Sequence, residues 1–185
     1  MYIPSFFALL VLPVVVGYNT FDARWIADRI ELHPCPNLPQ RLWASAQQSV
    51  HVVSPYVNVD LVDVPEEVGK NGINTICTSD AGYGFTRLTM ANHTITEADI
   101  FVHSALTGSN LDNVMLHELL HAVGLNHSEN AGIMNYSVRV NGKGEIVADP
   151  LLYLSLDDVQ GLKQLRKNST RCPKVRILNL LERCW

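Results

Sequence analysis

The sequence predicts a single α/β domain (α+β in its segregation of elements) with a lower part built around an irregular segment. The expected elements follow the order strand, helix, strands, helix, irregular segment and helix. The chain has 185 residues, which is enough for one core of good size and too few for two. Hydrophobic residues make up 47% of it and charged residues 17%, a composition typical of globular chains.

The first half of the chain contains two expected strands around one expected helix. Residues 24–32 read as a first strand, although their alternation is imperfect. Residues 37–53 predict a helix because their apolar residues recur at helical spacing, with Asn37 as the N-cap and Pro39 in the first turn. Residues 56–64 begin with strict alternation of apolar and polar residues and therefore predict a half-buried strand.

Turns and two further strands are expected in the middle of the chain. Glycine, asparagine and aspartate punctuate residues 66–72 and 79–85, which we read as turns. Residues 87–91 and 98–104 combine β-branched and apolar residues and predict strands.

Two helices are expected in the second half. Residues 110–125 give the strongest helical pattern of the chain. Residues 155–167 predict the last helix, which Ser155 opens as N-cap. Asp157 and Asp158 fall in its first turn, where the helix dipole favours acidic side chains.

The N-terminus reads as a secretory signal peptide over residues 1–17. Residues 6–16 are apolar but too short to span a bilayer as a helix, and Val15 and Gly17 suit a cleavage site. No later stretch is long and apolar enough to be a membrane anchor. We therefore expect a secreted, extracellular protein.

Four cysteines agree with an exported chain that forms two disulfides. Three pairings are possible, and the sequence does not choose among them. A Cys172–Cys184 bond would staple the tail, residues 168–185, and would leave Cys35 with Cys77.

Sequons for N-glycosylation begin at four asparagines. Asn126 and Asn135 lie within the candidate site described next, and we expect them to stay unmodified. Asn92 and Asn168 are therefore the glycosylation candidates. The formal net charge is −4 and no Lys/Arg cluster stands out, so nucleic acid is a poor partner class. We expect a monomer.

The eleven residues HELLHAVGLNH carry the chemistry. On a helix, His117 and His121 lie one turn apart on the same face, where two imidazoles can bind one zinc ion. Gly124 can end the helix sharply in a left-handed conformation, and His127 can then return as a third ligand. Three protein ligands leave one position open, which is typical of a catalytic zinc site. Glu118 can act as general base on a metal-activated water.

Three other interpretations compete with this one, and one of them is a secreted structural protein that is stapled by disulfides and binds no metal. A short H-E-x-x-H pattern also arises by chance as two solvated histidines on an exposed helix face, although the longer pattern here is far more specific. A catalytically silent binding module, with zinc as a structural staple, would keep the same histidines.

The motif resembles that of the metzincin zinc endopeptidases, which implies proteins or peptides as the substrates. Met134, seven residues after His127, looks like the methionine of the metzincin Met-turn, an apolar floor beneath the metal. Ser128 after the third histidine, and the residues YLSLDDVQGLKQL, resemble the matrixins. The resemblance implies a zincin-like catalytic domain over residues 18–167, with a mixed twisted sheet, two helices, an active-site cleft and a small lower subdomain that includes the C-terminal helix.

The same resemblance implies several roles for single residues. Asp157 and Asp158 would brace the Met-turn, and the substrate would lie extended along an edge strand, here residues 98–104. An apolar side chain is expected next to the cut. Cys35 has a faint likeness to the cysteine-switch peptide of matrixin precursors, but a disulfide is the better interpretation.

The sequence also departs from the matrixin pattern. Leu120 stands where matrixins usually have glycine, and Tyr136 follows Met134 by two residues, as in astacins and serralysins. Tyr136 is therefore a candidate stabiliser of the transition state, or alternatively a packed aromatic. The matrixin segment that holds a second zinc and calcium is not recognisable in the sequence, so one catalytic Zn²⁺ is expected. His93 and His103 lack a ligand pattern.

Overall fold

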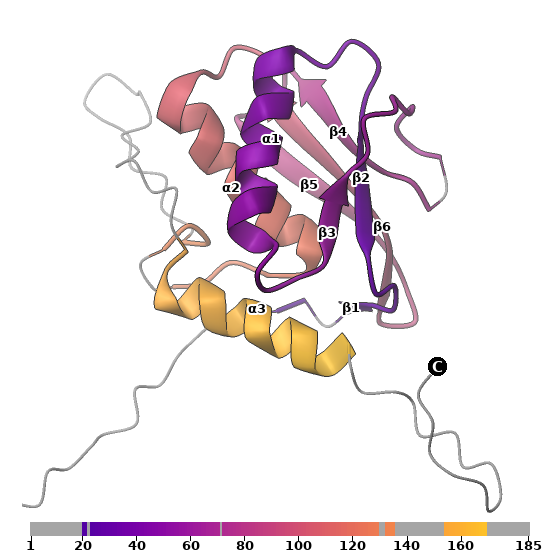
Figure 1. Cartoon of the computed structure of the whole chain (residues 1–185), viewed down its shortest axis with the longest axis vertical. Coiled ribbons are helices and arrows are strands. Elements are labelled where there is room, and N and C mark those ends of the chain that lie inside the picture. The colour runs from indigo at the N-terminus through magenta and orange to yellow at the C-terminus, as the bar shows by residue number, and fades with distance from the viewer. Residues whose placement is uncertain (1–19, 22, 71, 130–131, 136–153, 170–185) are drawn as a thin grey trace, which may run out of the picture.

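A computed structural model describes the protein (Figure 1). It covers residues 20–21, 23–70, 72–129, 132–135 and 154–169. Within these ranges the chain forms a six-stranded sheet and three helices. In chain order the elements are β1 Arg24–Trp25, β2 Ile30–Pro34, α1 Gln40–Val53, β3 Val59–Leu61, β4 Asn74–Ser79, β5 Gly84–Ala91, β6 Thr94–His103, α2 Gly108–Val123 and α3 Leu156–Ser169.

The sheet is mixed, as the sequence predicts. Its strands follow the order β1-β6-β4-β2-β3, and all of these neighbours run parallel. β5 pairs with β6 in the antiparallel sense. Helices α1 and α2 lie side by side on one face of the sheet, and α3 crosses below it next to β1 (Figure 1). The predicted α/β layout with two helices and a lower C-terminal helix is confirmed.

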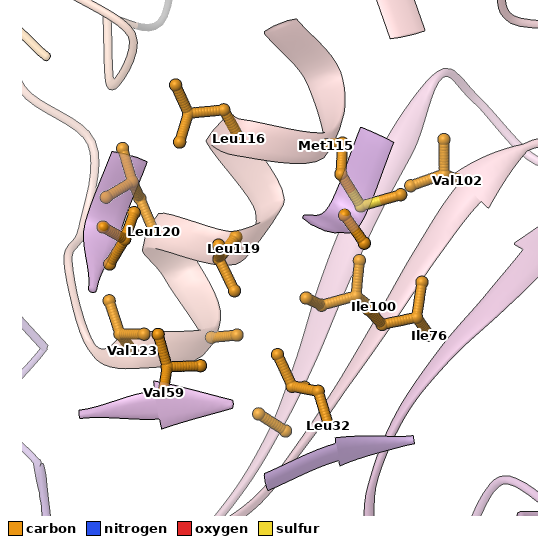
Figure 2. Packing of buried hydrophobic residues seen from close by; sticks show 14 of the residues in the cluster. Leu32, Val59, Ile76, Ile100, Val102, Met115, Leu116, Leu119, Leu120 and Val123 are labelled. Atoms are coloured by element: carbon orange, nitrogen blue, oxygen red, sulfur yellow. The ribbon is translucent and has the colours of Figure 1, made fainter. Parts of the chain in front are cut away.

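The core lies between α2 and the inner face of the sheet (Figure 2). Leu32, Ile76 and Ile100 come from three adjacent parallel strands and are almost fully buried. They face the apolar side of α2, which contributes Leu116 and Leu119. Burying such a side chain stabilises the fold by roughly 1.5–3 kcal/mol, so α2 is held in place along its whole length.

The predicted first and second strands differ in extent from those observed. The segment 24–32 is split into β1 and β2, which pair with different strands, at Thr94–Ile95 and at Val59–Leu61. The imperfect alternation of this segment reflects the break between them. β3 covers only three of the nine residues predicted for its strand.

Asn37 is not the N-cap of α1, so that prediction is wrong. Its φ is 63°, in the left-handed region, whereas an N-cap residue has extended backbone. Pro39 occupies the cap position, with φ −58° and ψ 135° and no side-chain hydrogen bond to the helix. The fixed φ of proline prepares the first turn in place of a capping side chain.

Strand β4 was not predicted, although it lies in the middle of the sheet. Its first residues are polar, and their partners are on neighbouring strands: Asn74 donates to the Glu31 carbonyl and accepts from the Ala98 N–H. Thr75 donates to the buried Asp99 carboxylate at 2.6 Å. These polar residues are buried because the neighbours satisfy them, which a local pattern does not reveal.

A disulfide joins Cys35, just after β2, to Cys77 in β4, with their Cα atoms 5.0 Å apart. This is one of the pairings expected from the sequence, and it gives Cys35 a structural role. The other two cysteines, Cys172 and Cys184, and the predicted signal peptide, residues 1–17, lie outside the described residues. Of the helices described, none is long and apolar enough to cross a bilayer.

Candidate metal centre and active site

The end of α2 returns the chain toward its own face. Gly124 has a φ of 113°, a left-handed conformation that favours glycine. Its N–H donates to the carbonyl of His121, and the N–H of Leu125 donates to that of Leu120 at 2.9 Å. The helix therefore stops within one residue, and His127 comes back beside His117 and His121.

Three imidazole nitrogens converge at this point. The Nε2 atom of His117 lies 3.1 Å from that of His121 and 3.2 Å from that of His127, and the last two are 3.2 Å apart. Zinc–nitrogen bonds of about 2.0–2.1 Å in a tetrahedral site require nitrogens about 3.3 Å apart. The three side chains therefore fit a zinc ion, and they form the one such cluster found in the described part of the chain.

Backbone carbonyls orient two of these rings. The Nδ1 atom of His117 lies 2.7 Å from the Ile133 carbonyl oxygen, and that of His121 lies 2.8 Å from the Leu125 carbonyl oxygen. A carbonyl only accepts, so each Nδ1 carries the proton and each Nε2 keeps a lone pair for a metal. The ring of Phe21 packs against His121 on another side, at a centroid distance of 5.9 Å.

Burial keeps these histidines neutral. It lowers the pKa of His121 to about 4, with a smaller contribution in the same direction from the neighbouring His117. It also lowers the pKa of His117 and of His127. Neutral imidazole is the form that binds a metal, so the environment holds the three side chains ready for it.

Glu118 occupies a buried position next to His117, with 5% of its surface exposed. Burial raises the pKa of its carboxyl to about 7, and a hydrogen bond from Thr86 acts in the opposite direction. The Thr86 hydroxyl lies 2.8 Å from Glu118 Oε2. A carboxyl whose pKa is near neutral can both take and return a proton under physiological conditions.

Gly84 gives Glu118 the room it occupies. A Cβ atom at Gly84 would lie 2.6 Å from Val114 Cγ1 and 3.1 Å from both Cγ and Oε1 of Glu118. Neither Gly84 nor Thr86 was identified from the sequence, because residues 79–85 read as a turn. Thr86 and Leu88 alternate with their sequence neighbours in the way that is typical of a strand. This pattern could have extended the predicted strand, residues 87–91, back to Gly84.

The segment after the third histidine is tied to α3. Met134 is 1% exposed, and its carbonyl accepts the N–H of Ser128 at 2.8 Å. The Asp158 carboxylate accepts the N–H of Ile133 at 3.3 Å, so the predicted brace of this turn is present at Asp158. Ser155 caps α3, since its Oγ accepts the N–H of Asp158 at 3.1 Å.

The predicted edge strand, residues 98–104, is not at the edge. Residues 98–103 belong to β6, which pairs with β4 on one side and β5 on the other. In the described part of the chain, no strand pairs with the outer side of β5. A strand that pairs on both sides has no free peptide groups, so β5 is the edge beside the site.

The peptide groups of β5 that face outward follow from its register. His103 donates its N–H to the Tyr83 carbonyl at 2.9 Å, so these opposite residues form a hydrogen-bonded pair. Such pairs alternate along antiparallel strands. The N–H and C=O groups of Gly84, Thr86 and Leu88 therefore point away from β6, toward the open edge.

The structure places the remaining predicted residues as follows. Tyr136 lies outside the described residues, and so does the side chain of Asn168. Asn92 is exposed in the β5–β6 turn, with a φ of 49°. Asn126 accepts the His127 N–H through its side-chain oxygen at 2.8 Å.

One cavity of about 350 Å³ lies elsewhere in the fold. It is bordered by Trp25 in β1, Tyr56 after α1, and Leu165 on α3, and neither Glu118 nor the three histidines line it. It is therefore not the active-site cleft expected from the resemblance.

Comparison with solved structures finds the same fold in other proteins, one of which is a zinc protease. The chain superposes on high choriolytic enzyme 1, a hatching-enzyme zinc protease from Oryzias latipes (Medaka fish), with a TM-score of 0.52 and 11% identity, over 79% of this chain and 94% of that one. It superposes on myroilysin with a TM-score of 0.53 and 11% identity, over 77% and 85% of the two chains. At this identity the likeness concerns the fold alone. No curated relative matches the chain.

A family model identifies the chain more closely. The model of the matrixin family, peptidase M10, matches residues 39–167. These 129 residues are well over half of the 185, and they include α1, α2, most of α3 and the three converging histidines. The chain belongs to the matrixin family and is a zinc metalloendopeptidase.

Proposed function

We propose that this protein is a secreted endopeptidase in which His117, His121 and His127 hold the catalytic zinc and Glu118 is the general base. The observation that carries the proposal is the convergence of three Nε2 atoms within 3.2 Å of one another, directly beside a buried glutamate. Matrixin membership supports zinc as the metal, and peptides as the substrates.

The reaction is hydrolysis of a peptide bond. Bound zinc supplies Lewis acidity, which makes water a nucleophile near neutral pH and polarises the carbonyl under attack. Glu118 accepts the proton of the attacking water as the new C–O bond forms. It delivers this proton to the nitrogen of the leaving amine as the C–N bond breaks. The pKa of about 7 that burial gives Glu118 suits both steps.

The substrate is an extended peptide that adds a strand to the sheet beside β5. Support comes from the register of β5, whose outward peptide groups belong to Gly84, Thr86 and Leu88. Main-chain hydrogen bonds of this kind bind peptides with little regard to sequence, and side-chain pockets then select among them. We expect an apolar residue next to the cut, which cleavage of a peptide library by the purified protein would test.

Two further residues have proposed roles at the site. Met134 would provide an apolar floor to the metal centre, and its burial supports this role. Tyr136 stabilises the developing oxyanion through its hydroxyl. Replacing Tyr136 by phenylalanine is expected to lower kcat with little change in KM, and an unchanged kcat would remove Tyr136 from the mechanism.

The protein reaches the extracellular space by way of a signal peptide, residues 1–17. The Cys35–Cys77 disulfide supports an oxidising destination. We propose residues 18–167 as the catalytic domain and residues 168–185 as a tail closed by Cys172–Cys184. N-terminal sequencing of the exported protein should begin at Tyr18, and a mature chain that still starts at Met1 would contradict the proposal.

We propose that the protein is a monomer. Its proposed glycan sites are Asn92 and Asn168. The exposure of Asn92 at the tip of the β5–β6 turn supports it as an acceptor. Digestion of the exported protein with a glycosidase should shift the masses of the peptides that contain these residues. Unshifted masses would argue against both sites.

Replacing Glu118 by glutamine tests the proposed function. The variant should retain one zinc per chain but lose roughly 10²–10⁴-fold in kcat, because glutamine cannot accept the proton. Glu129, an exposed glutamate two residues after His127, provides the matched control, and Glu129→Gln should cleave at the parental rate. Parental turnover by Glu118→Gln would refute the mechanism and leave zinc as a structural staple in a silent binding module.

A further inference from the structure

The hydroxyl of Thr86 connects the open edge strand to the proposed general base. It lies 2.8 Å from Glu118 Oε2 and 2.9 Å from the Glu118 backbone carbonyl. These contacts bridge β5 and α2, which are 32 residues apart in the chain at this point. Thr86 is half-buried, so it can lie next to both the core and the substrate edge.

The register of the sheet explains why this side chain faces the base. Thr86 lies opposite Ile100, which is fully buried in the core against the helices. Neighbours across a strand pair point to the same face, so the Thr86 side chain also points toward α2. Its β-branched side chain has restricted rotation about χ1, which limits where the hydroxyl can lie.

Gly84, two residues earlier, lies on the same face of β5 and also borders the Glu118 carboxyl. Its Cα approaches Glu118 so closely that a Cβ atom would lie 3.1 Å from Oε1. Thr86 therefore contacts one carboxyl oxygen, and the backbone at Gly84 limits the movement of the other. The glutamate is held by the strand as well as by its own helix.

We propose that Thr86 is a positioning residue, whose hydroxyl holds the Glu118 carboxylate in the orientation that proton transfer requires. This inference rests on the proposed role of Glu118 as general base. Thr86 also presents its own N–H and C=O to the open edge, where the substrate backbone would pair. A single residue thus sets the distance between the bound peptide and the Glu118 carboxylate, which transfers the proton of the attacking water.

The hydroxyl can keep this contact throughout the reaction. It donates to Oε2 when Glu118 is ionised, and such charge-assisted hydrogen bonds are the stronger kind. When Glu118 carries the proton, the hydroxyl can rotate, donate to the Glu118 carbonyl and accept from the carboxyl. The side chain therefore need not move between the two proton transfers.

Replacing Thr86 by valine, which keeps the shape and removes the hydroxyl, tests the proposal. On a quenched peptide substrate, kcat should fall roughly tenfold to a hundredfold, because small misplacements of catalytic groups have effects of this size. KM should stay within about twofold, since the backbone of β5 is unchanged. Thr86→Ser, which restores a hydroxyl, should recover kcat to within a few fold of the parental value.

Thr89→Val is the matched control, because Thr89 is exposed on the same strand and points to the opposite face. It should show parental kcat and KM. Zinc content and melting temperature are measured for every variant, and if Thr86→Val fails to bind zinc or to fold, Thr86→Ala replaces it. Parental kcat in a zinc-loaded variant without the hydroxyl overturns the proposal, as does an equal loss in Thr86→Ser.

The outcomes also separate this inference from the proposed function. If Glu118→Gln is inactive while Thr86→Val retains parental kcat, only the role of Thr86 is overturned. If Glu118→Gln retains parental turnover, the assignment of the general base fails, and the role of Thr86 falls with it.

Discussion

Replacing Gly84 by alanine would place a methyl group where β5 packs most tightly against α2. The new Cβ would lie 2.6 Å from Val114 Cγ1, well inside van der Waals contact, and 3.1 Å from Cγ and Oε1 of Glu118. Val114 is a packing residue of α2, and Glu118 is the proposed general base. The substitution should therefore affect stability and catalysis through two separate contacts.

The size of each effect can be estimated. Inserting a methyl group into a packed contact costs about 1–3 kcal/mol of folding free energy. For a chain of this length, each kcal/mol lowers the melting temperature by about 2–4 °C, so a fall of roughly 2–12 °C is expected. A displacement of Glu118 by a few tenths of an ångström should lower kcat by about tenfold or more.

A second substitution separates the two contacts. Val114→Ala removes the atom that meets the new methyl group, so the double variant Gly84→Ala/Val114→Ala should be more stable than the two single losses imply, by about 1 kcal/mol. Its kcat should stay low, because the contact with Glu118 remains. Thermal unfolding and steady-state cleavage of a quenched peptide measure the two effects. A Gly84→Ala protein with parental melting temperature and kcat would refute the close packing described for β5.

Two further predictions concern the metal ligands and their supports. In the metal-free protein, His121 has a pKa of about 4 against an ordinary value of 6.5; the unfolded chain therefore binds more protons between these values. The stability that neutral His121 provides is fully present above about pH 6.5 and is lost as the pH falls toward 4, by roughly 3 kcal/mol. Urea unfolding of chelated protein at several pH values checks this, and a flat profile would contradict it. Asp158→Asn should weaken the contact with the Ile133 N–H, loosen the carbonyl that orients His117, and reduce zinc affinity by about tenfold to a hundredfold. Competition with a zinc chelator measures that affinity, and parental affinity would exclude the link.

The arrangement of the histidines could be predicted because it depends on local geometry. The spacing of His117 and His121 is one helical turn, and Gly124 is the residue type that ends a helix in a left-handed conformation. The return of His127 then needs only a short segment. Each step involves neighbours in sequence, so an eleven-residue motif contains the information for it.

The surroundings of Glu118 could not be predicted in this way, because they depend on pairing between distant segments. Strand β4 was missed since its polar residues are satisfied by strands 24 and 43 residues away. Without β4, residues 98–104 would be free on one side, as an edge strand is. Once β4 pairs with β6, the open edge passes to β5, and Thr86 and Gly84 come next to the base.

The position of β5 changes what determines the geometry of the site. A substrate paired to β6 would be held by one element and the base by another, α2. With β5 at the edge, the strand that offers peptide groups to the substrate also contacts Glu118 through Thr86 and Gly84. The metal ligands, by contrast, are oriented by carbonyls that follow α2 in the chain. Changes in β5 should therefore alter turnover while zinc binding persists, and changes around Asp158 should alter zinc binding first.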